Sequence, residues 1–100
     1  MFIAMNRFKI SKNHCDDFEK IWRERDSYLE TVPGFKSFNL LKSTESEDFV
    51  LYASHSVWED ENAFTAWTES EEFRLAHRQA RAPKGTYVSH PELETFTSIL

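Results

Sequence analysis

The sequence predicts one α+β domain over residues 1–100, with its elements in the order β-α-β-β-α-β. Three observations lead to this fold class. The chain opens with a run that alternates as a half-buried strand does. Two central runs rich in aromatic and β-branched residues are separated by a short polar stretch, as in a hairpin. On each side of that hairpin lies a longer segment with apolar residues at helical spacing.

The first strand is predicted over residues 2–10. Side chains alternate between the two faces of a strand, so Phe2, Ala4, Phe8 and Ile10 share one face. Asn6 falls on the same face, in the middle of this apolar set. An amide is the wrong side chain for that position if packing alone decides, which makes Asn6 a candidate site residue.

A helix is predicted next, because the hydroxyl of Ser11 can cap its first turn. Pro33 and Gly34 are expected to end it. One side of this segment is charged, whereas the other is apolar at helical spacing. The apolar side consists of Cys15, Phe18, Ile21, Trp22, Leu29 and Val32.

The two central strands are predicted over Phe35–Lys42 and Phe49–Trp58, with Ser43–Asp48 as the hairpin loop. Residues 60–80 then predict a second helical segment, broken near Ser70. Acidic residues stand at its start and basic residues at its end, which complements the helix dipole. The acidic residues are Glu59, Asp60 and Glu61, and the basic end comprises Arg74, His77, Arg78 and Arg81.

A flexible basic loop is predicted over residues 82–86, followed by a last strand through Leu93, Phe96 and Ile99. This order of elements is the ferredoxin-like arrangement, an antiparallel sheet with helices on one face. Both alternating sets of residues in the third strand contain large apolar side chains, so neither sheet face is expected to be fully wet. We therefore expect a two-fold homodimer whose sheets face each other, forming a dimeric α/β barrel.

The composition excludes several classes of function. The formal charge of −5 provides no basic surface for nucleic acid, and two glycines provide no phosphate-binding loop. The single cysteine, Cys15, forms no internal disulfide or thiolate cluster, and we interpret it as a packing residue. No apolar run approaches ~20 residues and no leader opens the chain, which predicts a cytoplasmic protein without a membrane partner. No nucleophile elbow or Ser-His-Asp arrangement indicates a hydrolase.

His77 is a second candidate, on an apolar stripe with Phe73, Ala76 and Ala80. It is either a core histidine with one hydrogen bond or a metal ligand through a neutral ring nitrogen. No second histidine or carboxylate stands three or four residues away on its face, which argues against a zinc site. A ligand that brings its own four equatorial donors needs one protein atom, and haem is the common case.

The remaining candidates also have two interpretations. Asn6 either satisfies a neighbouring backbone group or hydrogen-bonds a ligand in an apolar pocket. Trp67 and Phe64 are either core residues or the wall of a macrocycle site. A basic cluster just after His77 is either solvated or placed for haem propionates. That cluster consists of Arg78, Arg81 and Lys84.

Together these residues resemble the antibiotic biosynthesis monooxygenase superfamily and, within it, the IsdG-type haem-degrading monooxygenases. The likeness covers nearly the whole chain, and its most specific part is the spacing of the Asn, Trp and His residues. The matching pieces are Asn6-Arg7, Pro33-Gly34-Phe35, Val57-Trp58, Ala63-Phe64-Thr65-Ala66-Trp67 and Phe73-Arg74-Leu75-Ala76-His77.

The resemblance implies that haem is both substrate and cofactor, with O2 and an external electron donor such as a reductase. By that resemblance, His77 is the axial ligand of the haem iron, Asn6 orients the bound oxygen, and Trp67 ruffles the porphyrin. The ring would open at a meso carbon and release iron. Further haem-binding residues on this interpretation are Phe64, Arg78 and Arg81.

Two other functions stay open at this point. A cofactor-free monooxygenase of the same superfamily would act on a quinol or phenolic substrate, with Asn6 and His77 positioning the ionised substrate. A non-catalytic haem-binding dimer would serve as a buffer or sensor. Haem binding separates the first of these from a haem-degrading enzyme, and turnover with a reductant separates the second.

Overall fold

The computed structural model describes residues 1–24, 28–44, 48–79 and 81–100, without the side chains of residues 78 and 79. Its elements follow the predicted order, so the α+β fold class is confirmed. They are β1 (Phe2–Ile10), a 3₁₀ turn η1 (Lys12–His14), α1 (Cys15–Glu24), a 3₁₀ turn η2 (Leu29–Thr31), β2 (Phe35–Lys42), β3 (Val50–Trp58), α2 (Glu61–Thr68), α3 (Glu71–Gln79) and β4 (Glu92–Thr97).

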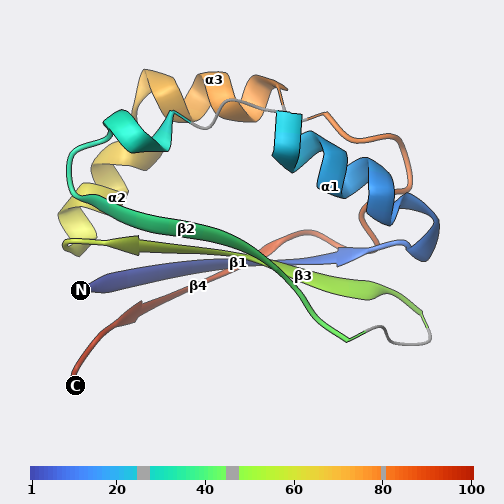
Figure 1. Ribbon diagram of the computed structural model, residues 1–100, viewed down its shortest axis with the longest axis horizontal. Helices are drawn as coiled ribbons and strands as arrows, with labels where there is room; N and C mark the ends of the chain where they lie inside the picture. The colour runs from blue at the N-terminus through green and yellow to red at the C-terminus, as the bar shows by residue number, and fades with distance from the viewer. Residues whose placement is uncertain (25–27, 45–47, 80) are drawn as a thin grey trace.

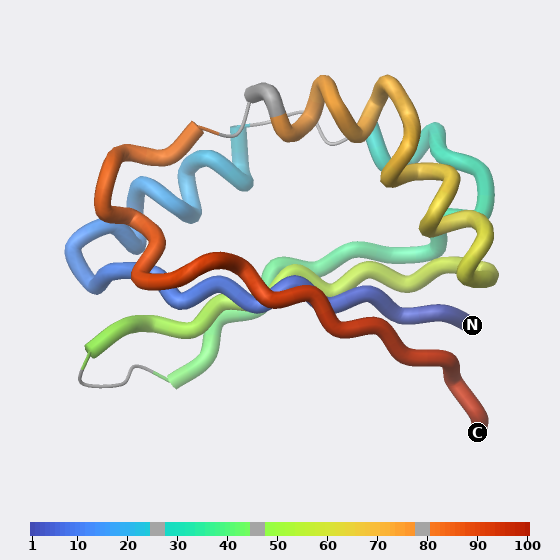
Figure 2. Tube along the Cα trace, turned by 180° about the vertical axis from the view of Figure 1, so that it is seen from behind, coloured from blue at the N-terminus to red at the C-terminus, as the bar shows by residue number. Residues whose placement is uncertain are grey.

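The four strands form one sheet in the order β2-β3-β1-β4, and each neighbouring pair is antiparallel. All three α-helices lie on one face of this sheet, and both chain ends lie at the same end of it (Figures 1 and 2). This is the ferredoxin-like arrangement. No helix in the described part of the chain is long and apolar enough to cross a membrane.

The first helix differs from the prediction at both ends. The chain enters it through η1, in which the carbonyl of Ser11 accepts from the N–H of His14, and the Ser11 hydroxyl makes no capping hydrogen bond. The helix then ends at Glu24 instead of reaching Pro33. Tyr28 adopts a left-handed conformation with φ of 59°, which an α-helix cannot contain. Leu29 therefore reaches the core from η2, and residues 25–27 lie outside the described part of the chain.

The second helical segment is two helices, and the break near Ser70 is confirmed. The carboxylate of Asp60 caps α2 by accepting from the N–H of Ala63 at 2.9 Å. Ser70 separates the helices: its hydroxyl donates to the carbonyl of Trp67 and accepts from the N–H of Phe73. This turn sets the end of α2, with Trp67, against the start of α3.

Within the loop predicted over residues 82–86, hydrogen bonds hold the part from Pro83 to Thr86. Thr86 is fully buried, and its N–H and hydroxyl both donate to the carbonyl of Pro83. Its own carbonyl accepts from the N–H of Ser11, which ties this segment to the end of β1. The last strand ends at Thr97, so Ile99 lies beyond it and is exposed.

Candidate functional site

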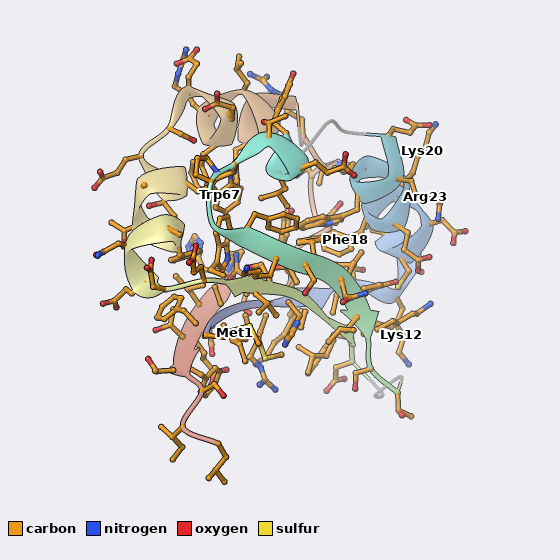
Figure 3. All side chains as sticks on the ribbon, turned by 60° about the vertical axis from the view of Figure 1, so that its left-hand side comes forward. Met1, Lys12, Phe18, Lys20, Arg23 and Trp67 are labelled. Atoms are coloured by element: carbon orange, nitrogen blue, oxygen red, sulfur yellow. The ribbon has the colours of Figure 1, made fainter. Side chains whose placement is uncertain are left out.

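A cavity of about 300 Å³ lies between the sheet and the helix layer. It exists because the inward-facing side chains in the middle of β1 and β3 are small, namely Ala4, Ser54 and Ser56, whereas those towards the strand ends are large. Members of two aromatic core clusters line it. One cluster is built on Phe8, Ile10, Phe18, Val50 and Tyr52, and the other on Phe2, Leu29, Trp58 and Trp67. In Figure 3, Phe18 lies towards α1 and Trp67 lies at the end formed by α2 and α3.

Asn6 lies on the sheet side of this cavity, as the strand alternation predicts. It pairs with Ser54 of β3 on one side and Leu93 of β4 on the other. The side chain is half-buried, and it makes no hydrogen bond to another described residue. A half-buried amide of this kind offers two donors and one acceptor to a ligand.

Trp67 forms one end of the cavity and is 9% exposed. Its indole packs on Trp58 at 5.3 Å between ring centroids and meets Phe73 edge-on at 4.8 Å. Phe64, 6.3 Å from Trp67, lines the same cavity. The indole Nε1 is buried and has no hydrogen-bond partner among the described residues. A buried donor without a hydrogen-bond partner lowers the stability of the fold. Such donors are found at functional sites, where a ligand or an ion can satisfy them.

His77 reaches the same cavity from α3, although its side chain is exposed and not buried on an apolar stripe as expected. The fully buried residue at this point is Ala76, and Ala80 lies outside the described residues. The imidazole lies on the ring of Phe73 at 4.0 Å and is 6.3 Å from that of Trp67. Its Nδ1 is 2.8 Å from the carbonyl of Phe73. Since a carbonyl can only accept, Nδ1 donates in this hydrogen bond, and in the neutral form of the ring the lone pair is then on Nε2.

The three residues singled out by sequence, Asn6, Trp67 and His77, therefore line one cavity from two layers of the molecule. The predicted basic residues are not shown to line this cavity. Arg81 and Lys84 are exposed and are not part of the cavity lining, and the side chain of Arg78 lies outside the described residues.

The far wall of the cavity was not predicted. Trp22 of α1 stacks on Phe38 of β2 at 5.6 Å with an interplanar angle of 18°, and both line the cavity with Tyr87. Ser54 also belongs to the lining. The alternation of β3 contained the signal for Ser54, but both faces of that strand carry apolar residues, so the sequence did not show which face was inward.

A second hollow, of about 370 Å³, lies on the η2 side of Trp67. Its lining includes Gly34, Asp60 and Glu72 but neither Asn6 nor His77. We therefore place the candidate chemistry in the first cavity, where the imidazole and the amide meet.

A partly buried hydrogen-bond network around Glu19 lies outside both cavities. Tyr52 is 1% exposed, and its hydroxyl donates to Oε2 of Glu19 at 2.5 Å, which also accepts from Nζ of Lys42 at 3.2 Å. The hydrogen bond from Tyr52 is the main cause that lowers the pKa of Glu19. Burial, followed by the hydrogen bond to Glu19, raises the pKa of Tyr52 well above 10.0. Cys15 packs beside this cluster, as expected.

Comparison with known proteins identifies the family. The model of the antibiotic biosynthesis monooxygenase family matches residues 1–79. The chain belongs to the antibiotic biosynthesis monooxygenase family. It is accordingly an oxidoreductase of the monooxygenase type.

Members of this family that resemble the chain differ in what they act on. The staphylobilin-producing heme oxygenase 1 of Staphylococcus aureus is 32% identical over 81 residues, which cover 81% of this chain and 75% of that protein. A mutant of MhuD with two manganese protoporphyrin IX molecules per active site matches with a TM-score of 0.79 at 25% identity, over 100% of this chain and 96% of that one. SnoaB, a cofactor-independent oxygenase from Streptomyces nogalater, matches with a TM-score of 0.73 at 20% identity, over 99% and 93%.

Proposed function

We propose that this family member is a haem-degrading monooxygenase, which binds haem in the cavity between sheet and helices and opens the porphyrin ring at a meso carbon. The observation that carries the proposal is the hydrogen bond from Nδ1 of His77 to the carbonyl of Phe73. It orients the imidazole and places the lone pair on Nε2, which is the form of histidine that binds a metal. The likeness to the S. aureus heme oxygenase supports the same substrate.

The residues around His77 fit a macrocycle better than a bare metal ion. No three His, Cys, Asp or Glu side chains in the described part of the chain gather to hold a metal. Iron at His77 would therefore need its remaining ligands from a ring such as porphyrin. The aromatic walls at both ends of the cavity, Trp67 with Phe64 and Trp22 with Phe38, suit a flat apolar ring.

Haem, when bound, would supply an iron that activates dioxygen after reduction by an external donor, and one meso carbon of its own ring would be oxidised. His77 would hold this haem from the helix layer. Asn6 directs its amide into the cavity from the sheet and orients a polar group there by hydrogen bonding. Trp67 is backed by Trp58 and Phe73, so a flat ring pressed against it deforms before the indole yields. We propose an electron-donating reductase as the partner that supplies the electrons.

The basic residues near the end of α3 and after it are proposed only to bind the haem propionates. Arg81 is exposed, and we propose that it binds a haem propionate, whereas the same role for Arg78 stays a prediction from the sequence because its side chain lies outside the described residues. Phe64 contributes packing against the ring. Replacement of Arg81 by alanine would weaken haem binding several-fold without changing the axial ligand.

The first test is a titration of the purified protein with haemin, followed through the Soret band, and then addition of ascorbate in air with catalase present. A saturable Soret band that decays on addition of ascorbate supports the proposal, because catalase removes the peroxide that would bleach haem without the enzyme. A bound haem that persists under reduction indicates a non-catalytic haem-binding protein and contradicts the proposed activity.

The role of His77 has its own test. His77→Ala should abolish turnover and greatly weaken the Soret band, whereas Asn6→Ala should keep haem bound and lose turnover. His90→Ala is the matched control, since His90 is exposed and lies outside the cavity. Unchanged turnover in the His77 variant would contradict the axial-ligand assignment.

A second function is favoured by the size of the cavity, because about 300 Å³ is at the small end of ligand sites and would also suit a quinol or phenol. The likeness in fold to SnoaB is in line with such a cofactor-free oxygenase. In that case Asn6 and His77 would position the ionised substrate. Absence of any haem binding in the titration would favour this function over haem degradation.

A further inference from the structure

The hydroxyl of Ser54 is a polar group next to Asn6 on the sheet side of the cavity. Ser54 lies in the middle of β3, half-buried, and is the direct cross-strand partner of Asn6. Opposed residues on one face of an antiparallel pair have Cβ atoms roughly 4.5–5.5 Å apart. The amide of Asn6 and the hydroxyl of Ser54 therefore stand side by side, and both line the cavity.

The neighbouring serine on the same strand shows what a structural hydroxyl does here. Ser56 is 8% exposed; its hydroxyl donates to the carbonyl of Ala4 and accepts from Nε1 of Trp58 at 2.9 Å. The side chain of Ser54, by contrast, makes no hydrogen bond to another described residue. Neither does the Asn6 side chain beside it. Hydrogen bonds within the fold thus account for the hydroxyl of Ser56, whereas the hydroxyl of Ser54 has no such bond among the described residues.

Resting on the proposed function, we propose that Ser54 is a second positioning residue for the ligand, which donates a hydrogen bond to the same small polar group as Asn6. The geometry favours a shared acceptor, since His77 approaches from the helix layer and this pair approaches from the sheet. A small polar group between the ring and the sheet would then be within reach of both donors. Two adjacent donors hold such a group in one direction, whereas one donor leaves it free to rotate.

The test uses azide as a probe on the ferric haem complex, so that it does not depend on turnover. Ser54→Ala should raise the dissociation constant of azide about 3- to 10-fold, which is the effect of losing one ordinary hydrogen bond. The dissociation constant of haem should change less than about twofold, because the iron ligand and the aromatic walls are intact. Ser54→Thr, which keeps the hydroxyl, should restore azide affinity.

Thermal unfolding provides the readout for a purely structural role. Ser54→Ala should keep the unfolding midpoint within about 2 °C of the unmodified protein, since the hydroxyl has no protein partner to lose. A large drop in the midpoint, or azide affinity equal to that of the unmodified protein, overturns the role of Ser54 while the proposed function stands. If the unmodified protein binds no haem at all, the proposed function fails and this inference fails with it.

Discussion

The side chain of Trp67 contributes to the stability of the fold and, in the proposed function, to the reaction. Its indole is packed between Trp58 and Phe73, yet Nε1 is buried without a partner in the described part of the chain. Trp67→Phe keeps an aromatic wall and removes the unsatisfied donor, so part of the packing loss is offset and the free energy of unfolding should fall by only about 1–2 kcal/mol. Urea denaturation measures this change.

The same variant tests whether Trp67 deforms a bound ring. Phenylalanine is smaller and should press less firmly, so Trp67→Phe should bind haem within about threefold of the unmodified protein and degrade it more slowly. The measurement is the single-turnover decay of the Soret band. Equal decay rates would show that distortion by this side chain is not part of the reaction.

Tyr52 and Glu19 predict a pH-dependent contribution to stability. The pKa of Glu19 is lowered from 4.5, chiefly by the hydrogen bond from Tyr52, so its contribution is complete above pH 4.5 and is lost as the pH falls through the lower folded-state pKa. Tyr52→Phe should cost about 1.5–3 kcal/mol of unfolding free energy at pH 7, and this difference should shrink at pH 3. Urea titrations at both pH values measure it. A difference that is equal at pH 3 and pH 7 would assign the loss to packing instead.

At the scale of single residues, sequence reasoning identified the unusual side chains but not their neighbours. Asn6 could be found because an amide interrupts an apolar face, and its place on the cavity floor followed from strand alternation. The exposure of His77 could not be predicted, because helical periodicity does not show how far α3 lies from the sheet. Ser54 and Trp22 were missed for a related reason: small and aromatic residues acquire a site role only when elements far apart in sequence meet.

At the scale of elements, Gly34 lies just before β2 and approaches Ala63 of α2 closely. Its φ of +81° is strained for other residues, and an added Cβ would lie 2.5 Å from Cβ of Ala63. Its carbonyl also accepts from the N–H of Glu59 at 2.8 Å, so the turn cannot move away freely. Gly34→Ala should therefore lower the free energy of unfolding by about 2–4 kcal/mol, from backbone strain and overpacking together.

Gly85 offers the matched control for that variant. Its φ is +88°, but an added Cβ would have its nearest contact at 3.8 Å, on Nε2 of His14. Gly85→Ala thus carries the backbone strain without the clash and should cost about 1–2 kcal/mol. Chemical denaturation of both variants under the same conditions separates the two effects. If Gly34→Ala cost no more than Gly85→Ala, the contact with Ala63 would have relaxed.

The strands could be predicted closely, because period-two patterning is a property of neighbouring residues; β2 has the predicted bounds, and β3 begins one residue later than predicted. The end of the first helix could not, because Leu29 and Val32 continue the helical spacing of α1 by coincidence. Both reach the core from outside α1, after the left-handed residue Tyr28. Apolar spacing alone does not distinguish a long helix from a short helix followed by a compact turn.

For the whole molecule, the sheet face opposite the helices has no second layer of the described part of this chain over it (Figure 1). A row of apolar side chains crosses it, formed by Val57 of β3, Ile3 of β1 and Phe96 of β4, and Leu41 and Phe96 are 44% and 47% exposed. The helices lie entirely on the other face. A standard interface takes about 800 Å² from each partner, a small part of the 6819 Å² surface of this chain. We therefore predict that two chains pair through this face, with the two cavities on the outer sides of the dimer.

Val57→Glu tests this assembly without touching the cavity, since the side chain of Val57 points away from the helix layer. A charge buried between two apolar faces is costly, so the variant should sediment at 11.8 kDa, whereas the unmodified protein should sediment at twice that mass. Thr65→Glu adds the same charge on the exposed side of α2 and should remain dimeric. Because each cavity is built within one chain, the Val57 variant should still give a saturable Soret band with haemin. Sedimentation of the unmodified protein as a monomer at every concentration would show that the apolar face is not a dimer interface.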